Sequence, residues 1–149
     1  MKSFYACLDT AFVKYVPQPL QHLAIHEKAR KLGGQVSYYT MEDITAMAGH
    51  GSVRAKIDED PVDEGIIYFT LRQFCYGESL DLTFLRYILD KGYGVHFARE
   101  DISIFNTGDL DSQFPMLYST QQLWNRDDDQ ETWRSVWEQL TNVEQDQLH

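Results

Sequence analysis

Segments that read as short strands alternate along this chain with segments that read as helices, and no other feature constrains the fold as strongly. The four strand-like segments are rich in apolar, β-branched and aromatic residues and span 3–9, 35–40, 65–71 and 93–98. Such alternation implies a parallel sheet with right-handed crossovers and helices on its faces. The chain therefore predicts an α/β fold of the flavodoxin-like, three-layer type, with about four mostly parallel strands in the order 2-1-3-4.

Two of the intervening helices are delimited by signals at their ends. The first is predicted over 20–34, because a basic last turn is followed by the helix-stopping pair Gly33–Gly34. The second is predicted over 80–91, with Ser79 as its N-cap.

The charge of the chain is unevenly distributed. Residues 1–99 contain 12 acidic and 11 basic residues, whereas residues 100–149 contain 11 acidic and 2 basic residues. We therefore expect an α/β domain over 1–105 and an acidic C-terminal extension over 106–149. A net charge of −10 repels phosphate polymers, so we expect neither nucleic acid nor an anionic membrane as a partner.

The cysteine content and the amino terminus indicate the compartment. Cys7 and Cys75 are the only cysteines, and the amino terminus has no signal-peptide pattern. No apolar run approaches the ~18 residues that a membrane-spanning helix needs. These features favour a cytoplasmic protein with free thiols.

The acidic extension ends in an amphipathic helical pattern over 131–143. Its apolar stripe consists of two tryptophans and three aliphatic residues: Trp133, Val136, Trp137, Leu140 and Val143. Two tryptophans are costly to leave in water, because each aromatic side chain can bury ~150–250 Å². The helix could pack on the chain's own sheet layer or on a second copy of the chain. Because other helices already cover the sheet in such a fold, we expect a second copy, with a symmetric dimer as the default form.

Polar residues follow each of the four predicted strands. They are Asp9 and Thr10, Thr40 and Glu42, Arg72 and Gln73, and Arg99 and Glu100. Ligands of open α/β sheets bind outside the carboxyl ends of the strands, so these residues predict a site for a polar ligand.

Arg72 is suited to binding a carboxylate or phosphate, and Asp9 and Glu100 are candidates for an acid–base pair. The alternative is that Arg72 only pairs with one of these acids and ties strand ends together. We expect Asp9, Arg72, Gln73 and Glu100 to share one solvent-accessible pocket with Gln21 at its edge. An exposed ion pair in such a pocket would contribute about 0–1 kcal/mol to stability.

Three histidines have simpler interpretations. His22 and His26 are four residues apart on one predicted helix, a spacing that permits metal binding, but no third ligand is evident. We therefore predict no metal site. His96 lies inside a predicted strand and is expected to be a satisfied core residue.

Three stretches of the chain resemble a known family, and they read VPQPLQHLAIHEKARKLGGQVSYY, GIIYFTLRQF and YILDKGYGVHFAREDISI. This is the sporadic carbohydrate cluster protein family, whose small bacterial members are encoded among genes of surface-polysaccharide biosynthesis. The family's helix-opening pattern is matched by Pro19, Gln21 and His22, and its later glutamate by Glu42. The stretch AMAGHGSVRAK departs from the family's spacing. The resemblance implies a role in carbohydrate biosynthesis but no particular reaction.

The layout also resembles the catalytic domain of serine recombinases. In that family the first strand ends in a nucleophilic serine, and the third ends in an Asp-Arg-Leu-x-x-Arg motif. Here Asp9 occupies the nucleophile position, Cys7 replaces an arginine, and Arg72 matches only the first arginine of the motif. Phosphoryl transfer to DNA needs a hydroxyl nucleophile and several cations. The resemblance therefore implies a resolvase-like fold without that chemistry.

Together these patterns predict a small cytoplasmic protein of surface-polysaccharide biosynthesis that binds a sugar, a nucleotide sugar or a similar anion. The candidate catalytic residues are Asp9, Arg72 and Glu100, although the sequence does not decide whether the protein is an enzyme. The candidate ligand-binding residues are Thr10, Gln21, His22, Glu42 and Gln73. No cofactor is indicated. The alternative is a non-catalytic adaptor or regulatory protein that acts through its acidic C-terminal helix.

Overall fold

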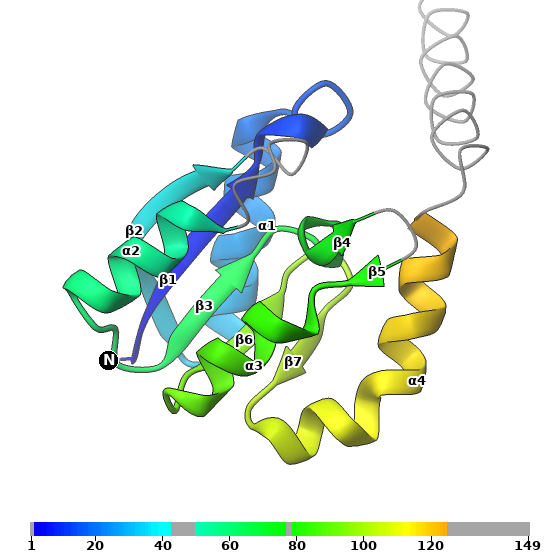
Figure 1. Ribbon diagram of the computed structural model, residues 1–149. Coiled ribbons are helices and arrows are strands. Elements are labelled where there is room, and N and C mark those ends of the chain that lie inside the picture. Colours follow the sequence, from blue (N-terminus) through cyan, green and yellow to red (C-terminus); the bar gives the residue numbers. More distant parts are fainter. Residues whose placement is uncertain (1, 43–49, 77–78, 125–149) are drawn as a thin grey trace, which may run out of the picture.

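A computed structural model describes residues 2–42, 50–76 and 79–124 of the chain (Figure 1). Within these residues a five-stranded, mostly parallel sheet forms the centre of the molecule. From one edge to the other its strands are β2 (Gly34–Glu42), β1 (Lys2–Asp9), β3 (Gly65–Tyr68), β6 (Gly94–Phe97) and β7 (Ile102–Ile104). The first four are parallel to one another, and β7 is antiparallel to β6. The predicted α/β class with a mostly parallel sheet is confirmed.

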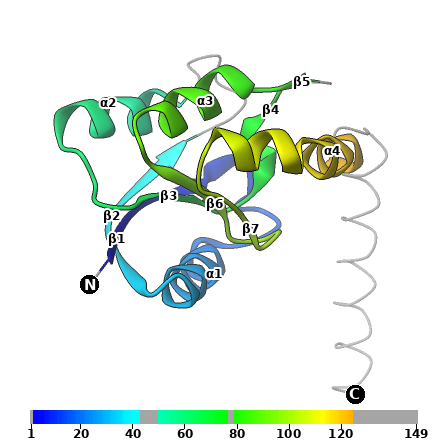
Figure 2. The ribbon, with the colours of Figure 1, turned by 90° about the horizontal axis from the view of Figure 1, so that it is seen from below.

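Helices cover both faces of this sheet (Figure 2). On one face lies α1 (Gln18–Lys31), and on the other lie α2 (Gly51–Glu59), α3 (Leu82–Asp90) and α4 (Thr107–Trp124). Every residue of β3 and β6 is buried, as expected for parallel strands that are covered on both sides.

The strand β1 contributes to two apolar cores, because successive side chains of a strand point to opposite faces. Ala6 and Leu8 pack with Ile25 of α1 in the smaller core. Tyr5 and Cys7 belong to the larger core, together with residues from the three helices of the other face. The carboxyl end of β1 therefore lies between two packed layers.

The third predicted strand is shorter than expected. It ends at Tyr68, and a 3-10 helix, η2 (Leu71–Phe74), occupies the residues that follow. The turn is stabilised by a capping box, in which the Thr70 hydroxyl accepts from the Arg72 N–H at 3.3 Å and Gln73 Oε1 accepts from the Thr70 N–H at 3.1 Å. Arg72 therefore lies on a short helix beyond the strand.

The prediction that Ser79 caps the following helix is wrong. The segment Ser79–Leu80 forms β5, which pairs antiparallel with β4 (Cys75–Tyr76). The helix α3 begins later, and Asp81 caps it by accepting a hydrogen bond from the Phe84 N–H at 3.1 Å.

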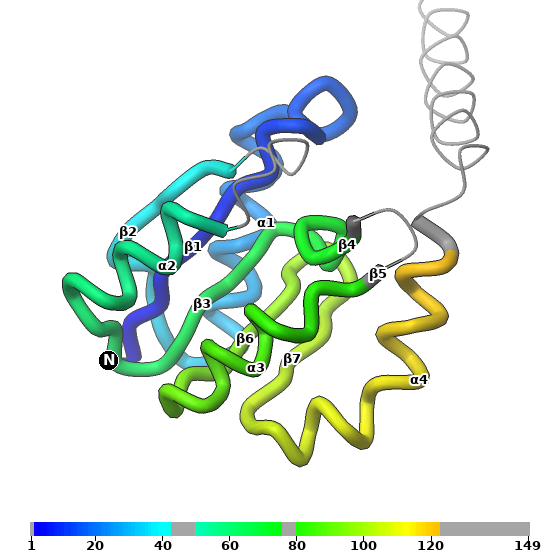
Figure 3. The backbone as a smooth tube through the Cα atoms, in the orientation of Figure 1, coloured from blue at the N-terminus to red at the C-terminus, as the bar shows by residue number. Residues whose placement is uncertain are grey.

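The helix α4 lies in the segment that we predicted as an acidic extension. Its Leu110 and Leu117 are buried in the larger core, so this segment contributes to the folding of the sheet domain. Figure 3 shows α4 running from the end of β7 toward the β4–β5 pair. The predicted amphipathic helix over 131–143 lies outside the described residues. Within the described part of the chain, no helix combines the length and the apolar character needed to cross a membrane.

Candidate functional site

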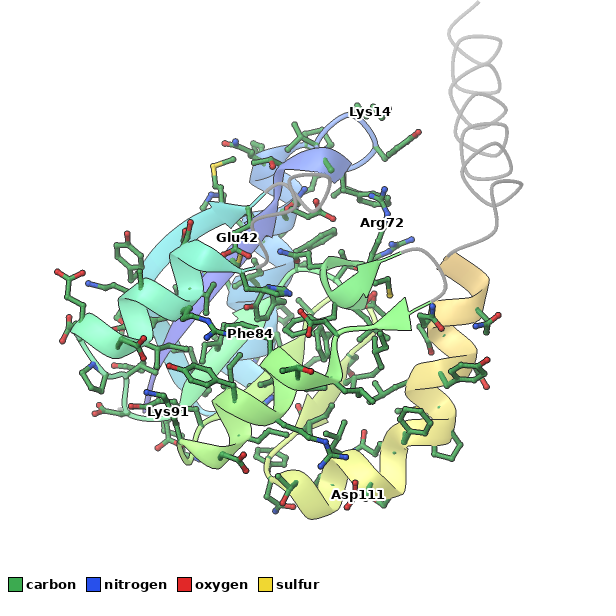
Figure 4. All side chains as sticks on the ribbon, viewed as in Figure 1. Lys14, Glu42, Arg72, Phe84, Lys91 and Asp111 are labelled. Atoms are coloured by element: carbon green, nitrogen blue, oxygen red, sulfur yellow. The ribbon has the colours of Figure 1, made fainter. Side chains whose placement is uncertain are left out.

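The carboxyl ends of the four parallel strands meet at one edge of the sheet, which we call the carboxyl edge. Asp9 ends β1, Glu42 ends β2, and η2 with Arg72 follows β3 at this edge. Figure 4 shows Glu42 and Arg72 on this side of the molecule. The sequence prediction that these polar residues lie at one edge therefore has a direct structural counterpart.

Asp9 is completely buried at the end of β1. Its Oδ1 accepts a hydrogen bond from the Ala11 N–H at 3.1 Å and so caps the short 3-10 helix η1 (Thr10–Phe12). Its Oδ2 lies 3.8 Å from Nη1 of Arg72. The carboxylate thus positions both the turn after β1 and the guanidinium group of Arg72.

Arg72 lies over an aromatic ring at the rim of the site. Its guanidinium carbon is 5.1 Å from the centroid of the Phe12 ring, a cation–π distance. The Arg72 side chain is 18% exposed. Its charged group is therefore largely desolvated but remains at the protein surface.

Arg99 lies over the same ring, with its guanidinium carbon 4.7 Å from the Phe12 centroid. Burial lowers the pKa of Arg99 and the nearby charge of Arg72 lowers it further, whereas Glu100 and Asp9 act in the opposite direction. The sequence places Arg99 just after the fourth parallel strand, among the polar residues expected at the strand ends, but it is not among the candidate catalytic or ligand-binding residues. That position was the signal that could have identified it.

Two polar atoms beside Asp9 are buried without a hydrogen-bond partner in the described part of the chain. They are Oγ1 of Thr10, the next residue, and Nη1 of Arg72. Such atoms are uncommon in folded proteins, because an unsatisfied buried polar group costs about 1–3 kcal/mol. We call Asp9, Thr10, Phe12, Arg72 and Arg99 the Arg72 cluster.

Gln21 is buried and supports the cluster from α1. Its Oε1 accepts from the Asp9 N–H at 2.9 Å, and its Nε2 donates to the Asp9 carbonyl at 3.0 Å and to the Val16 carbonyl at 3.0 Å. The side-chain amide therefore replaces a strand partner for the last residue of β1. Its role is to hold the backbone, since its polar atoms are directed at main-chain groups.

Gln73 holds the same strand end from η2. Its Nε2 donates to the Leu8 carbonyl at 3.3 Å and lies 3.4 Å from both the carbonyl oxygen and Sγ of Cys7. Burial of the Cys7 thiol, with Glu42 as the next cause, raises its pKa well above the usual value. This cysteine is therefore a neutral core residue.

Glu100, just beyond β6, is hydrogen-bonded to the turn after β3. Its carboxylate accepts hydrogen bonds from the Thr70 hydroxyl and from the Leu71 N–H, the latter at 3.0 Å. Burial raises the pKa of Glu100, and these hydrogen bonds lower it. The contacts of Glu100 therefore position η2, and with it Arg72.

Glu42 makes its contacts with α2. Its Oε1 accepts from the Val53 N–H at 3.2 Å, and its Oε2 lies 3.2 Å from Nδ1 of His50. The buried His50 ring is stacked on Phe84, and its Nε2 lies 3.7 Å from Asp81. The buried His50, at the start of α2, therefore contacts the end of β2 and the start of α3. These contacts of His50 were not predicted from the sequence.

His22 lies on α1 next to the edge strand β2. Its ring centroid is 4.4 Å from that of Tyr39. The structure thus brings together Asp9, Thr10 and Arg72, places Gln21, Gln73 and Glu100 around them as supports, and gives Glu42 and His22 other neighbours.

Comparisons of this chain with protein-family models, with curated proteins and with solved structures give no match.

Proposed function

We propose that this protein binds an anionic sugar-type ligand, such as a sugar phosphate or a nucleotide sugar, at the Arg72 cluster. The observation that carries the proposal is the pair of unsatisfied buried atoms, Arg72 Nη1 and Thr10 Oγ1. An anionic oxygen at this position would accept from both, because a guanidinium and a hydroxyl each donate a hydrogen bond. The ligand would thereby supply the hydrogen bonds that these two buried atoms lack.

The presence of a second arginine, Arg99, near Arg72 favours an anionic ligand over a neutral one. Arg72 and Arg99 both lie over the Phe12 ring, so two positive charges are held close together. A guanidinium forms paired hydrogen bonds with phosphate or carboxylate oxygens, and these charge-assisted bonds are stronger than neutral ones. The ring contacts both groups before the ligand arrives, which restricts their side chains and reduces the entropy lost on binding.

The contacts of the two acidic residues, Asp9 and Glu100, favour a binding function and indicate no particular reaction. Asp9 is fully buried and caps η1, and Glu100 is engaged by Thr70 and Leu71. A general acid or base must reach a substrate proton within about 2.6–3.2 Å. The proposal therefore assigns both carboxylates to positioning the arginines.

We also propose a biosynthetic role and a cellular compartment for this binding activity. The resemblance to the sporadic carbohydrate cluster family motivates a role in surface-polysaccharide biosynthesis in the cytoplasm. We further propose that the sheet domain is of the resolvase-like type without recombinase chemistry, with neither nucleic acid nor membrane as a partner. The net charge of −10 supports this, because it disfavours extended polyanions.

Isothermal titration calorimetry tests the proposal. The wild-type chain is titrated with glucose 1-phosphate, UDP-glucose, glucuronate and neutral glucose, and then the variants Arg72→Met and Arg99→Met are titrated. We expect an anionic ligand to bind and neutral glucose not to bind, and we expect each variant to lose about tenfold or more in affinity, which corresponds to about 1.4 kcal/mol.

The matched control is Arg86→Met on α3, whose guanidinium pairs with the exposed Asp111 at 3.2 Å. This variant removes one arginine without touching the cluster and should bind like the wild type. The proposal fails if none of the anionic ligands binds, or if binding is the same in Arg72→Met and Arg99→Met as in the control.

A second candidate function is that of an adaptor that forms a homo-oligomer. The observation in its favour is the outer face of α4, where the Phe114 and Tyr118 rings are stacked at 6.0 Å and remain 38% and 49% exposed. Light scattering on the eluted protein tests this function: the double substitution Phe114→Ser and Tyr118→Ser tests the face of α4, and truncation after Asp129 tests the predicted terminal helix. A dimer that becomes a monomer in either variant supports it, and a wild type that is monomeric at high micromolar concentration contradicts it.

A further inference from the structure

Two histidines of α1 and one tyrosine of β2 lie together on the surface, away from the Arg72 cluster. His22 and His26 are one helical turn apart, which places both imidazoles on the same side of α1. Tyr39 of the edge strand contacts both rings, with centroid distances of 4.4 Å to His22 and 5.7 Å to His26. The Tyr39 hydroxyl lies 2.6 Å from Nε2 of His26.

The neighbouring strand supplies a third ligand atom, which α1 alone does not provide. Histidines four residues apart on one helix face are a recurring arrangement for binding zinc. From the sequence the pair had no third ligand, but the fold brings the Tyr39 oxygen against His26 from a segment 13 residues further along the chain. One turn before His22, Gln18 Nε2 lies 3.5 Å from Sδ of Met41, which is a further contact between α1 and β2.

We propose that His22, His26 and Tyr39 form a binding site for a divalent transition-metal ion of the Zn²⁺ or Cu²⁺ type. Imidazole nitrogens suit both of these ions, and the hard cations Mg²⁺ and Ca²⁺ prefer all-oxygen sites. No group of three His, Cys, Asp or Glu side chains within the described residues is arranged to hold a metal. The tyrosine oxygen is therefore the necessary third donor, and water completes the coordination.

Binding replaces a proton with the metal ion. In the free protein one hydrogen is shared between Tyr39 Oη and His26 Nε2. When the ion binds both atoms, the phenol loses its proton to solvent, and a metal–oxygen and a metal–nitrogen bond replace the hydrogen bond.

For the Tyr39–His26 pair, metal binding requires only a small movement. Ligands about 2.0–2.1 Å from a tetrahedral ion are roughly 3.3 Å apart. The two atoms must therefore separate by less than about 1 Å from their present 2.6 Å. Tyr39 packs against the smaller core, so the exposed His26 ring is the side chain that would move. The bound ion would link α1 to the edge strand β2. It would also stabilise the folded state, because it binds the folded state and not the unfolded chain.

The test uses the untagged full-length chain. Zinc chloride is titrated by calorimetry into the wild type, His22→Ala, His26→Ala and Tyr39→Phe, and Cu²⁺ binding is followed by visible absorption. We expect one equivalent of metal in the wild type and a loss of at least about tenfold in affinity in each variant, the loss that removal of outer-shell partners already causes. The copper complex should show a phenolate-to-copper charge-transfer band that Tyr39→Phe abolishes.

The matched control is His149→Ala, which removes one imidazole from the chain without changing the three ligands. A second measurement needs no variant, because Zn²⁺ should shift the imidazole resonances of His22 and His26 in the spectrum of the wild type. Binding that stays unchanged in both histidine variants overturns the proposal, as does binding only at millimolar metal. Wild-type affinity in Tyr39→Phe would overturn the role of the tyrosine as third ligand.

Discussion

The Oδ2 atom of Asp9 lies 3.8 Å from Nη1 of Arg72, and the Asp9 side chain is completely buried while Arg72 is 18% exposed. From the sequence we expected an exposed ion pair worth about 0–1 kcal/mol. That expectation is wrong, because one partner has no contact with solvent. Removing the other partner of a largely buried pair leaves a desolvated charge, which is far more costly than losing a surface contact.

A double-mutant cycle measures this coupling. We expect Arg72→Met to destabilise the protein by about 1–3 kcal/mol, and Asp9→Asn combined with Arg72→Met to cost less than the sum of the single variants. Urea denaturation of the four proteins gives the free energies of unfolding. Strictly additive values would mean that the two groups do not interact.

Substitution of Gln21 should destabilise the end of β1. Gln21→Leu removes three hydrogen bonds and leaves the buried N–H and carbonyl of Asp9 without this partner, so we expect a loss of about 2–4 kcal/mol. Gln18→Leu is the control, because Gln18 is an exposed glutamine on the same helix, and its loss should change stability by no more than about 0.5 kcal/mol. Equal effects of the two substitutions would contradict the supporting role of Gln21.

The sheet could be predicted from the sequence because its signal is local. The apolar run at 65–68 and the run at 94–97 need no distant partner to be recognised as buried parallel strands. The polar residues at their ends could be predicted for the same reason, since strand direction alone determines which edge they occupy.

The supporting contacts could not be predicted, because they depend on how separate elements meet. Ser79 has the chemistry of an N-cap, but strand pairing with β4 moves the start of α3 to Asp81. His50 lies between Gly49 and Gly51, and this local sequence does not reveal which carboxylates surround it. Arg99 precedes Glu100 in sequence, and only the position of Phe12 shows that it joins Arg72.

Gly65 should not tolerate a side chain. It pairs with Gly94 across β3 and β6, and a Cβ added to Gly65 would lie 2.2 Å from the Gly94 carbonyl oxygen. The neighbouring group is backbone and cannot rotate away, so Gly65→Ala should destabilise by about 3 kcal/mol or more, at or beyond the usual range for overpacking. Thermal unfolding followed by circular dichroism measures the change.

Gly51→Ala is the matched control for this substitution. A Cβ at Gly51 meets no atom within 4 Å, and the residue lies in the first turn of α2. Alanine is the better helix former, so this variant should be stabilised by up to about 1 kcal/mol. A Gly65→Ala protein as stable as the control would show that the two strands separate more easily than their pairing indicates.

His96 should make the folded state sensitive to acid. It is buried in β6, as predicted, and its Nδ1 lies 2.9 Å from the Ser103 hydroxyl. Burial, with a smaller effect from Lys28, lowers the pKa of His96 to about 4. The unfolded chain, in which a histidine has a pKa of about 6.5, therefore binds a proton more readily than the folded protein does. The stability contributed by the neutral ring is fully present above pH ~6.5 and is lost as the pH falls toward ~4.

The variant His96→Asn isolates this effect, because its amide can retain a hydrogen bond to Ser103 without titrating. Between pH 7 and pH 5 the wild type should lose about 2 kcal/mol more stability than the variant does. Urea denaturation at both pH values gives the two differences, and other titrating groups cancel because both proteins share them. The same pH dependence in both proteins would contradict this prediction, because it would mean that folding does not change the pKa of His96.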